Sequence, residues 1–168
     1  MATNFERAFE NRPDVYAAWG GLITSVRENM DFRRYELATF AAAQRLRSSY
    51  CSLAHGKVLR DQLGAPLLAI ATDRAGVEAG LDEVDLAVME LAERVVDDAT
   101  SVADGDRQCL RDLGLTDAEI MDVVLAAAAR CFFSKTLDAL GVLPDAAYGE
   151  LDAELREVLV VGRPIAER

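Results

Sequence analysis

The segment from about Phe32 to Leu46 is apolar on almost every face of the helix that its residues predict. Its apolar side chains include Leu37, Ala38, Phe40, Ala41, Ala42 and Ala43. A surface helix keeps one polar face, so a helix of this kind has to be covered on all sides. We therefore expect it in the core of a multi-helix domain or at a contact between subunits.

The rest of the chain predicts further helices and no strand, so the expected fold class is all-α. Apolar residues recur at helical spacing, Ala and Leu are frequent, and Gly falls mostly at segment ends. Gly64 is placed to end one helix, and Thr116 with Glu119 forms a capping-box sequence that opens the longest one. The other predicted helices span about 14–28, 48–63, 66–71, 82–98, 116–140 and 148–161.

The length of 168 residues suits one compact multi-helix domain, which we expect to span 1–168. Its core is expected at about 15–142, followed by the C-terminal helix at about 148–161. The loop near 72–80 is the one place where the chain divides, but each half is small for an independent domain.

Charge and hydropathy limit the partners. The net charge is −11, from 29 acidic and 18 basic residues, which argues against a nucleic-acid partner. No window reaches the roughly 18 unbroken apolar residues of a membrane helix, so no membrane partner is expected. The first residues are charged and lack the core of a signal peptide, which favours a cytoplasmic location.

The three cysteines, Cys51, Cys109 and Cys131, are far apart and odd in number. With a single histidine in the chain, they predict neither a disulfide framework nor a structural metal site. We expect no metal and no cofactor. Cys131 lies in an apolar run and is interpreted as a small buried residue, and Cys109 lies in an acidic stretch and is expected to be exposed.

Cys51 has a more suggestive setting. His55, the only histidine, follows it by four residues and so shares its helix face. If Ser48 is the N-cap, Cys51 is the third residue of the helix, where the helix dipole and free amide groups favour a thiolate. The basic residues Arg45, Arg47 and Lys57 flank the motif and are expected to add positive charge there. From the residues alone, Cys51 is either a reactive thiol or a small buried cysteine.

Two further residues belong to this group. Glu36 lies inside the apolar segment described first, where a carboxylate needs a partner or a purpose. That partner is either the Cys51–His55 pair or a simple ion pair with Arg33, Arg34 or another arginine. Tyr50 is interpreted as a packing residue with a bonded hydroxyl, or as a group that orients a ligand.

Taken together, Glu36, Ser48, Cys51 and His55 resemble the signature of the alkylhydroperoxidase D and carboxymuconolactone decarboxylase superfamily. In its antioxidant branch a glutamate is followed twelve residues later by Cys-x-x-Cys, and a histidine comes four residues after the second cysteine. Residues 116–142 are also similar to the long closing helix of that family, so the resemblance covers about 15–142.

The resemblance implies an all-α fold, a homo-oligomer and thiol peroxidase activity on a small hydroperoxide. Cys51 would be the peroxidatic thiol, His55 would take its proton, and Glu36 would hold or relay that proton. Ser48 stands where the family has its first, resolving cysteine, so the usual internal disulfide cannot form. Reduction would then need an external thiol, or Cys109 or Cys131.

Two other functions stay open. One is a decarboxylase-type enzyme, in which His55 and Glu36 do acid–base work on a small carboxylated substrate anchored by Arg45, Arg47 or Lys57. The other is a helical oligomer without catalysis, in which Cys51 acts as a redox sensor.

Overall fold

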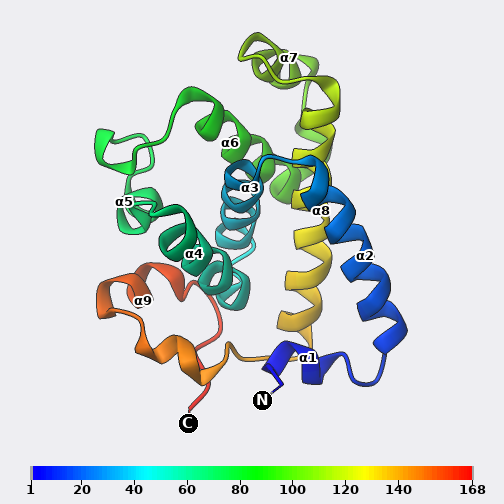
Figure 1. Ribbon diagram of the computed structural model, residues 1–168, viewed down its shortest axis with the longest axis vertical. Coiled ribbons are helices and arrows are strands. Elements are labelled where there is room, and N and C mark those ends of the chain that lie inside the picture. Colours follow the sequence, from blue (N-terminus) through cyan, green and yellow to red (C-terminus); the bar gives the residue numbers. More distant parts are fainter. Residues whose placement is uncertain (1, 168) are drawn as a thin grey trace.

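Helix α3 (Phe32–Arg45) lies at the centre of the computed structural model, which describes residues 2–167. Every residue from Tyr35 to Ala43 is buried. The helix packs against α4 (Ser49–Leu63), α6 (Glu83–Asp98) and α8 (Asp117–Ala139), which surround it in Figure 1. The prediction of a helix covered on all sides is confirmed, and in this chain the core supplies the cover.

The apolar core has three parts, and α3 contributes to each of them. The first lies toward α6, α8 and α2 (Pro13–Asn29), and the second toward α4, α5 (Leu67–Thr72) and α9 (Ala153–Leu159). The third lies between the end of α1 (Asn4–Ala8), the start of α4 and the second half of α8, and it contains Cys51.

Two predicted helix ends are confirmed, at Gly64 and at Thr116, where local sequence motifs determine them. Gly64 ends α4 in the left-handed conformation, with φ 60°, which costs glycine little. Thr116 caps α8, and the Glu119 side chain bonds back to it as a capping box. The single helix expected at 148–161 is wrong. It divides into the 3₁₀ turn η3 (Ala146–Glu150) and α9, because Leu151 is extended and its side chain is buried.

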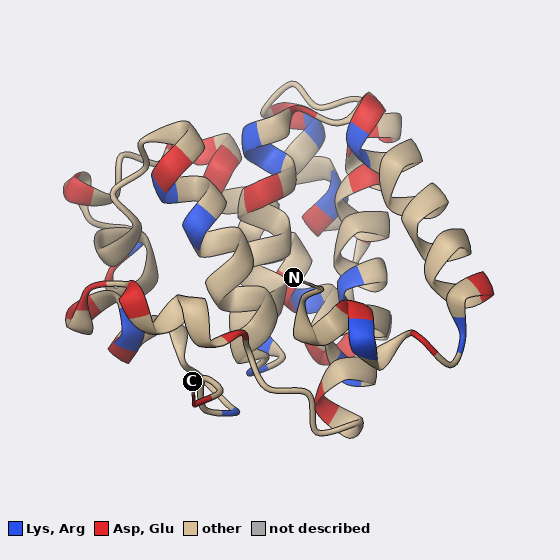
Figure 2. Ribbon diagram, turned by 60° about the horizontal axis from the view of Figure 1, so that its bottom comes forward, with Lys and Arg blue, Asp and Glu red and all other residues tan. Residues whose placement is uncertain are grey.

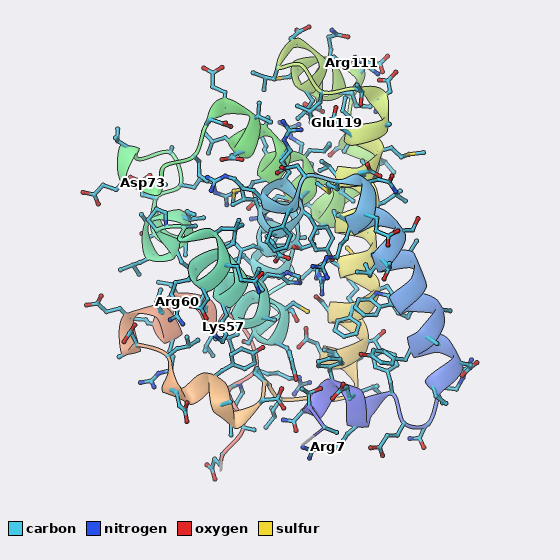
Figure 3. All side chains as sticks on the ribbon, viewed as in Figure 1. Arg7, Lys57, Arg60, Asp73, Arg111 and Glu119 are labelled. Carbon is cyan, nitrogen blue, oxygen red and sulfur yellow. The ribbon has the colours of Figure 1, made fainter. Side chains whose placement is uncertain are left out.

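Charged side chains are spread over the outside of the helices. Figure 2 shows acidic and basic residues interspersed on most of them, and in Figure 3 labelled examples such as Arg7 and Asp73 point outward. Within the described residues, no helix is long and apolar enough to cross a membrane.

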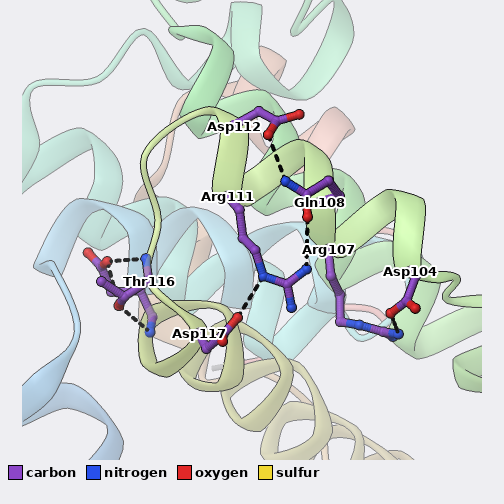
Figure 4. A network of polar contacts seen from close by, with 8 residues as sticks. Asp104, Arg107, Gln108, Arg111, Asp112, Thr116 and Asp117 are labelled. Carbon is purple, nitrogen blue, oxygen red and sulfur yellow. Dashed lines mark hydrogen bonds and ion pairs between the residues drawn. The ribbon is translucent and has the colours of Figure 1, made fainter.

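Two helices were not predicted, α1 and α7 (Asp104–Asp112), as well as two further single turns, η1 (Val77–Ala79) and η2 (Ala99–Ser101). Helix α7 is short and strongly polar, and it depends on side-chain bonds more than on burial. Arg111 reaches Asp117 at the start of α8 at 2.7 Å, and Gln108 donates to Asp112, as Figure 4 shows. Its main buried anchor is Leu110.

The C-terminal tail closes over the start of α4. The backbone N–H of Gly162 donates to Ser49 Oγ at 2.8 Å, and the Arg163 guanidinium donates to the Asp138 carbonyl. Arg47, in the turn before α4, has a φ of 56°. A Cβ on Gly162 would overlap the carbonyl oxygen of Arg47, so glycine lets the tail approach this turn closely.

The substitution Gly162→Ala is expected to destabilise the protein by about 1–3 kcal/mol, the usual cost of forcing a methyl group into occupied space. The cost arises because either the tail or the turn before α4 must move. Urea unfolding measures it. Gly149→Ala is the control, since a Cβ there meets nothing within 4 Å. Equal stability of the two variants would contradict this account of the tail.

Candidate active site

Cys51 is the third residue of α4, as predicted, and it is buried, with 1% of its surface exposed. Ser48 is the N-cap residue of α4, but its side chain accepts no capping hydrogen bond from the first turn. Around the sulfur, the apolar cluster includes Tyr50, Phe133 and Leu137. The sulfur is therefore at a helix start and away from bulk water.

Arg130, on α8, is the charged partner of this sulfur. Its Nη1 donates to Cys51 Sγ at 3.4 Å, and the residue is only 3% exposed. Burial lowers the pKa of Arg130, but the nearby Cys51, Tyr35 and Glu36 raise it by more, so the guanidinium stays positively charged. The guanidinium carbon also lies 5.7 Å from the centre of the Phe133 ring. A buried positive charge in contact with a thiol favours the thiolate.

Glu36, which is buried, and His55, which is mostly buried, form a second pair. His55 Nδ1 lies 2.6 Å from Glu36 Oε2, and the two side chains are 14% and 3% exposed. A carboxylate only accepts, so Nδ1 carries the proton and Nε2 is left as an acceptor. Thr39 supports this assignment. Its hydroxyl donates its proton to the Tyr35 carbonyl at 2.7 Å, so the oxygen, 3.2 Å from Nδ1, is left to accept from Nδ1.

The histidine is poised to accept a proton. Burial lowers the pKa of His55, and the positive charge of Arg130 lowers it further, whereas the hydrogen bond to Glu36 raises it; the net shift is downward. The imidazole is therefore neutral near pH 7. A neutral imidazole held by a carboxylate is the usual arrangement of a general base.

The structure brings together Glu36 with His55, and Cys51 with Arg130. The expected alternative partners of Glu36 are engaged elsewhere: Arg33 pairs with Asp85 and Arg34 with Glu119. The Cys51 sulfur receives its hydrogen bond from Arg130, and no hydrogen bond joins it directly to His55. A proton that passes between them needs a bridging water or substrate.

The expectation that Arg45, Arg47 and Lys57 add positive charge next to Cys51 is wrong. Arg45 pairs with Asp97, and Lys57 pairs with Asp61, both at the surface. Arg47 is exposed in the turn before α4. All three side chains are at the surface, so the positive charge next to the sulfur comes from Arg130 on α8, 79 residues away in the sequence.

Tyr50 is a packing residue with a bonded hydroxyl, one of the two interpretations of it. It donates to Asp145, and burial together with that bond raises its pKa. Ser48 is fully buried at the start of α4. Cys109 is exposed on α7, and Cys131 is half-buried, where burial raises its pKa.

Arg130 and Thr39 are the site residues that the sequence analysis missed. A signal for Arg130 was present: it is a lone charge in the apolar run from Ala126 to Phe133. The rule that applies to Glu36, that a charge on an apolar helix needs a partner, applies equally to this arginine. Thr39 lies one helical turn from Tyr35 and Glu36 and gave no comparable signal.

Two solved structures have a similar fold. One is the crystal structure of an alkylhydroperoxidase AhpD core protein from Ralstonia eutropha JMP134, described as an uncharacterized peroxidase-related protein. Its TM-score is 0.76 at 20% identity, over 97% of this chain and 84% of that one. The other is an uncharacterized peroxidase-related protein from Silicibacter sp. TM1040, with a TM-score of 0.79 at 19% identity, over 89% of this chain and 80% of that one.

The sequence itself matches no family model and no curated protein. The structural likeness shows that the chain has the AhpD-like all-α fold, as the motif predicted. At 19–20% identity the likeness concerns the fold alone.

Acidification is expected to destabilise the protein through His55. Because its pKa is lower in the folded state, the unfolded chain binds this proton more readily. The free energy of unfolding therefore falls as the pH drops below about 6.5, and this fall ends once the pH is below the folded pKa. Urea unfolding at a series of pH values measures it. His55→Gln lacks this component, and a pH-independent difference between the two proteins would contradict the shift.

Removing the Arg130 charge is expected to slow the reaction of Cys51. In a background with Cys109→Ser and Cys131→Ala, Arg130→Gln should lower the rate of alkylation by iodoacetamide roughly ten- to a hundredfold. That range corresponds to the loss of a hydrogen bond to a charged group, about 1.5–3 kcal/mol. Intact-protein mass spectrometry at neutral pH follows the reaction.

Arg34→Gln is the matched control, because it removes the same charge from the surface pair with Glu119. Circular dichroism checks that both variants fold. If the two variants alkylate at the same rate, the Arg130–Cys51 contact does not activate the sulfur.

Proposed function

We propose that this protein is a thiol-dependent peroxidase that reduces small organic hydroperoxides through Cys51. The contact between Arg130 Nη1 and Cys51 Sγ carries the proposal, because it holds a positive charge against a thiol at a helix start. The Glu36–His55 pair supports it with a base nearby, and the fold is that of two peroxidase-related proteins.

In the first step the thiol proton of Cys51 passes through water to His55 Nε2, leaving a thiolate that Arg130 stabilises. The thiolate attacks the terminal oxygen of the hydroperoxide. A sulfur–oxygen bond forms, the oxygen–oxygen bond breaks, and the sulfur is oxidised to sulfenic acid. The alkoxide that leaves takes the proton from His55 and departs as an alcohol, so protons and electrons balance.

Glu36 assists this step through the imidazole. Its carboxylate fixes the proton on Nδ1 and stabilises the imidazolium that forms when Nε2 accepts a proton. Glu36 touches His55 and not the sulfur, so its role is to position and stabilise the base. Thr39 adds a second contact to the same nitrogen.

We propose that an external thiol completes the second half of the cycle. Ser48 has no sulfur, and Cys109 lies on α7, well away from the start of α4 in Figure 1. Cys131 on α8 is the remaining internal thiol, and the double variant described below tests it. One reductant thiol condenses with the sulfenic acid, releasing water and forming a mixed disulfide. A second thiol attacks that disulfide, restores Cys51 and releases the oxidised reductant. A homo-oligomer remains part of the proposal.

A second candidate is an acid–base enzyme that acts on a small carboxylated substrate through His55. One observation favours it: Arg130 Nε is buried without a hydrogen-bond partner, so this guanidinium has a free donor for a carboxylate. Arg130 would then replace the surface cations Arg45, Arg47 and Lys57 as the anchor. In that enzyme the sulfur is dispensable, so Cys51→Ser would remain active.

The decisive test compares Cys51→Ser with the double variant Cys109→Ser/Cys131→Ala. Under turnover with cumene hydroperoxide and a small thiol, Cys51→Ser should lose all activity above the uncatalysed rate. The double variant should keep its activity within about twofold, since neither Cys109 nor Cys131 takes part in the proposed reaction. Loss of the hydroperoxide is measured, and mass spectrometry after one equivalent of peroxide should locate the added oxygen on Cys51.

Oxidation at Cys109 with Cys51 unreacted would contradict the peroxidase. Stoichiometric and reversible oxidation of Cys51, without turnover by any of several thiols, would instead identify a redox sensor.

A further inference from the structure

The sulfur of Cys51 is buried, so a substrate needs a way in. A cavity of about 940 Å³ opens where the N-terminal residues, the second half of α4, the η3 turn and the C-terminal tail meet; Cys51 does not line it, and Tyr148 is its link to the packing around the sulfur. Arg7 on α1 and Lys57 and Arg60 on α4, labelled in Figure 3, line its outer part. Its volume lies in the range of small-molecule sites.

Tyr148 connects this cavity to the site. It lines the cavity, and it also packs against the apolar cluster that contains Cys51. Its ring lies 6.2 Å from that of Tyr50, almost perpendicular to it, and Tyr50 is the neighbour of Cys51 in the chain. Tyr148 is therefore shared by the cavity wall and by the packing around the sulfur.

The electrostatics agree with this placement. Burial raises the pKa of Tyr148 to about 12, and the charges of Asp145 and Cys51 contribute to the rise. No hydrogen bond joins the Tyr148 hydroxyl to another described residue, so no polar contact holds the ring in place.

We propose that this cavity is the entrance by which a hydroperoxide reaches Cys51, with Tyr148 as the wall between them. The inference rests on the proposed peroxidase function and names the substrate class. Ala146, Ala147 and Leu151 give the cavity an apolar lining next to Tyr148. The fitting substrate is an organic hydroperoxide with an apolar chain or ring, larger than hydrogen peroxide.

The competing route runs past His55, whose side chain is 14% exposed. That route avoids Tyr148 and the cavity altogether. Variants that fill the cavity or remove its inner wall therefore distinguish the two routes.

The experiment uses the Cys109→Ser/Cys131→Ala background, so that Cys51 is the only thiol. Ala147→Trp fills the cavity from its exposed side, and Tyr148→Ala removes the wall. Ala18→Trp is the control, on an exposed position of α2 outside the cavity. Four rates are measured: alkylation of Cys51 by an aromatic maleimide and by iodoacetamide, and its oxidation by cumene hydroperoxide and by hydrogen peroxide.

We expect Ala147→Trp to slow the maleimide and cumene hydroperoxide by about tenfold, and iodoacetamide and hydrogen peroxide by less than about twofold; tenfold corresponds to about 1.4 kcal/mol. Tyr148→Ala should accelerate the maleimide by a similar factor. Ala18→Trp should change none of the four rates. Unchanged maleimide and cumene hydroperoxide rates in Ala147→Trp would overturn the proposal, and this exposed substitution decides the matter if Tyr148→Ala fails to fold.

The two proposals fail differently. If alkylation responds to the cavity variants but peroxides leave Cys51 unoxidised even in the parent, the peroxidase function is wrong and the cavity stands as the route to the sulfur. If peroxides oxidise Cys51 at rates that the cavity variants leave unchanged, the peroxidase stands and the cavity is not its entrance.

Discussion

A buried positive charge in an apolar interior is the constraint from which this site follows. Arg130 is almost fully enclosed, and an isolated ion in such a place costs several kcal/mol, at least. Three neighbouring groups raise the pKa of Arg130: the Cys51 sulfur, the Tyr35 hydroxyl and the Glu36 carboxylate. Arg130 and Glu36 balance each other while Cys51 is a thiol and His55 is neutral. Moving the thiol proton to His55 leaves the net charge of the four groups at zero, so the transfer creates no uncompensated charge inside the protein.

Three rigid helices hold this balance in place. Glu36 comes from α3, Cys51 and His55 from α4, and Arg130 from α8, and α3 packs against both of the others. None of the four side chains depends on a mobile loop for its position. The tail adds a further brace, because Gly162 bonds to the first residue of α4. A site built on packed helices keeps its geometry before any ligand arrives.

The sequence predicts the periodic helices well, because an apolar face of 3.6-residue period has few other ways to be buried. The Gly64 and Thr116 ends follow from equally local chemistry, as does the place of Cys51 in the first turn. Helices α1 and α7 escape prediction because they are short and polar. Asn4 of α1 bonds to Asp145, far along the chain, and α7 is held by side-chain bonds such as that of Arg111 to Asp117. The pairing of Glu36 with His55 was one of two options, since spacing alone does not fix how two helices meet. The role of Arg130 could be seen only in the fold, because no local sequence signal places α8 against the start of α4.

Burial of the sulfur shapes the chemistry as much as its charge partner does. An arginine stabilises a thiolate most where water is excluded, because a lower dielectric strengthens the attraction between the two charges. The same exclusion keeps most molecules away from the sulfur, so a buried thiolate is selective by access. Cys109, exposed on α7, has the opposite setting: reagents reach it freely, but the ion pairs and hydrogen bonds of α7 join its arginines to acidic side chains rather than to its sulfur. With Ser48 in place of a second thiol, the oxidised sulfur also has no internal partner at the start of its own helix. Its fate then depends on what the protein admits from outside, which makes the way in a part of the mechanism.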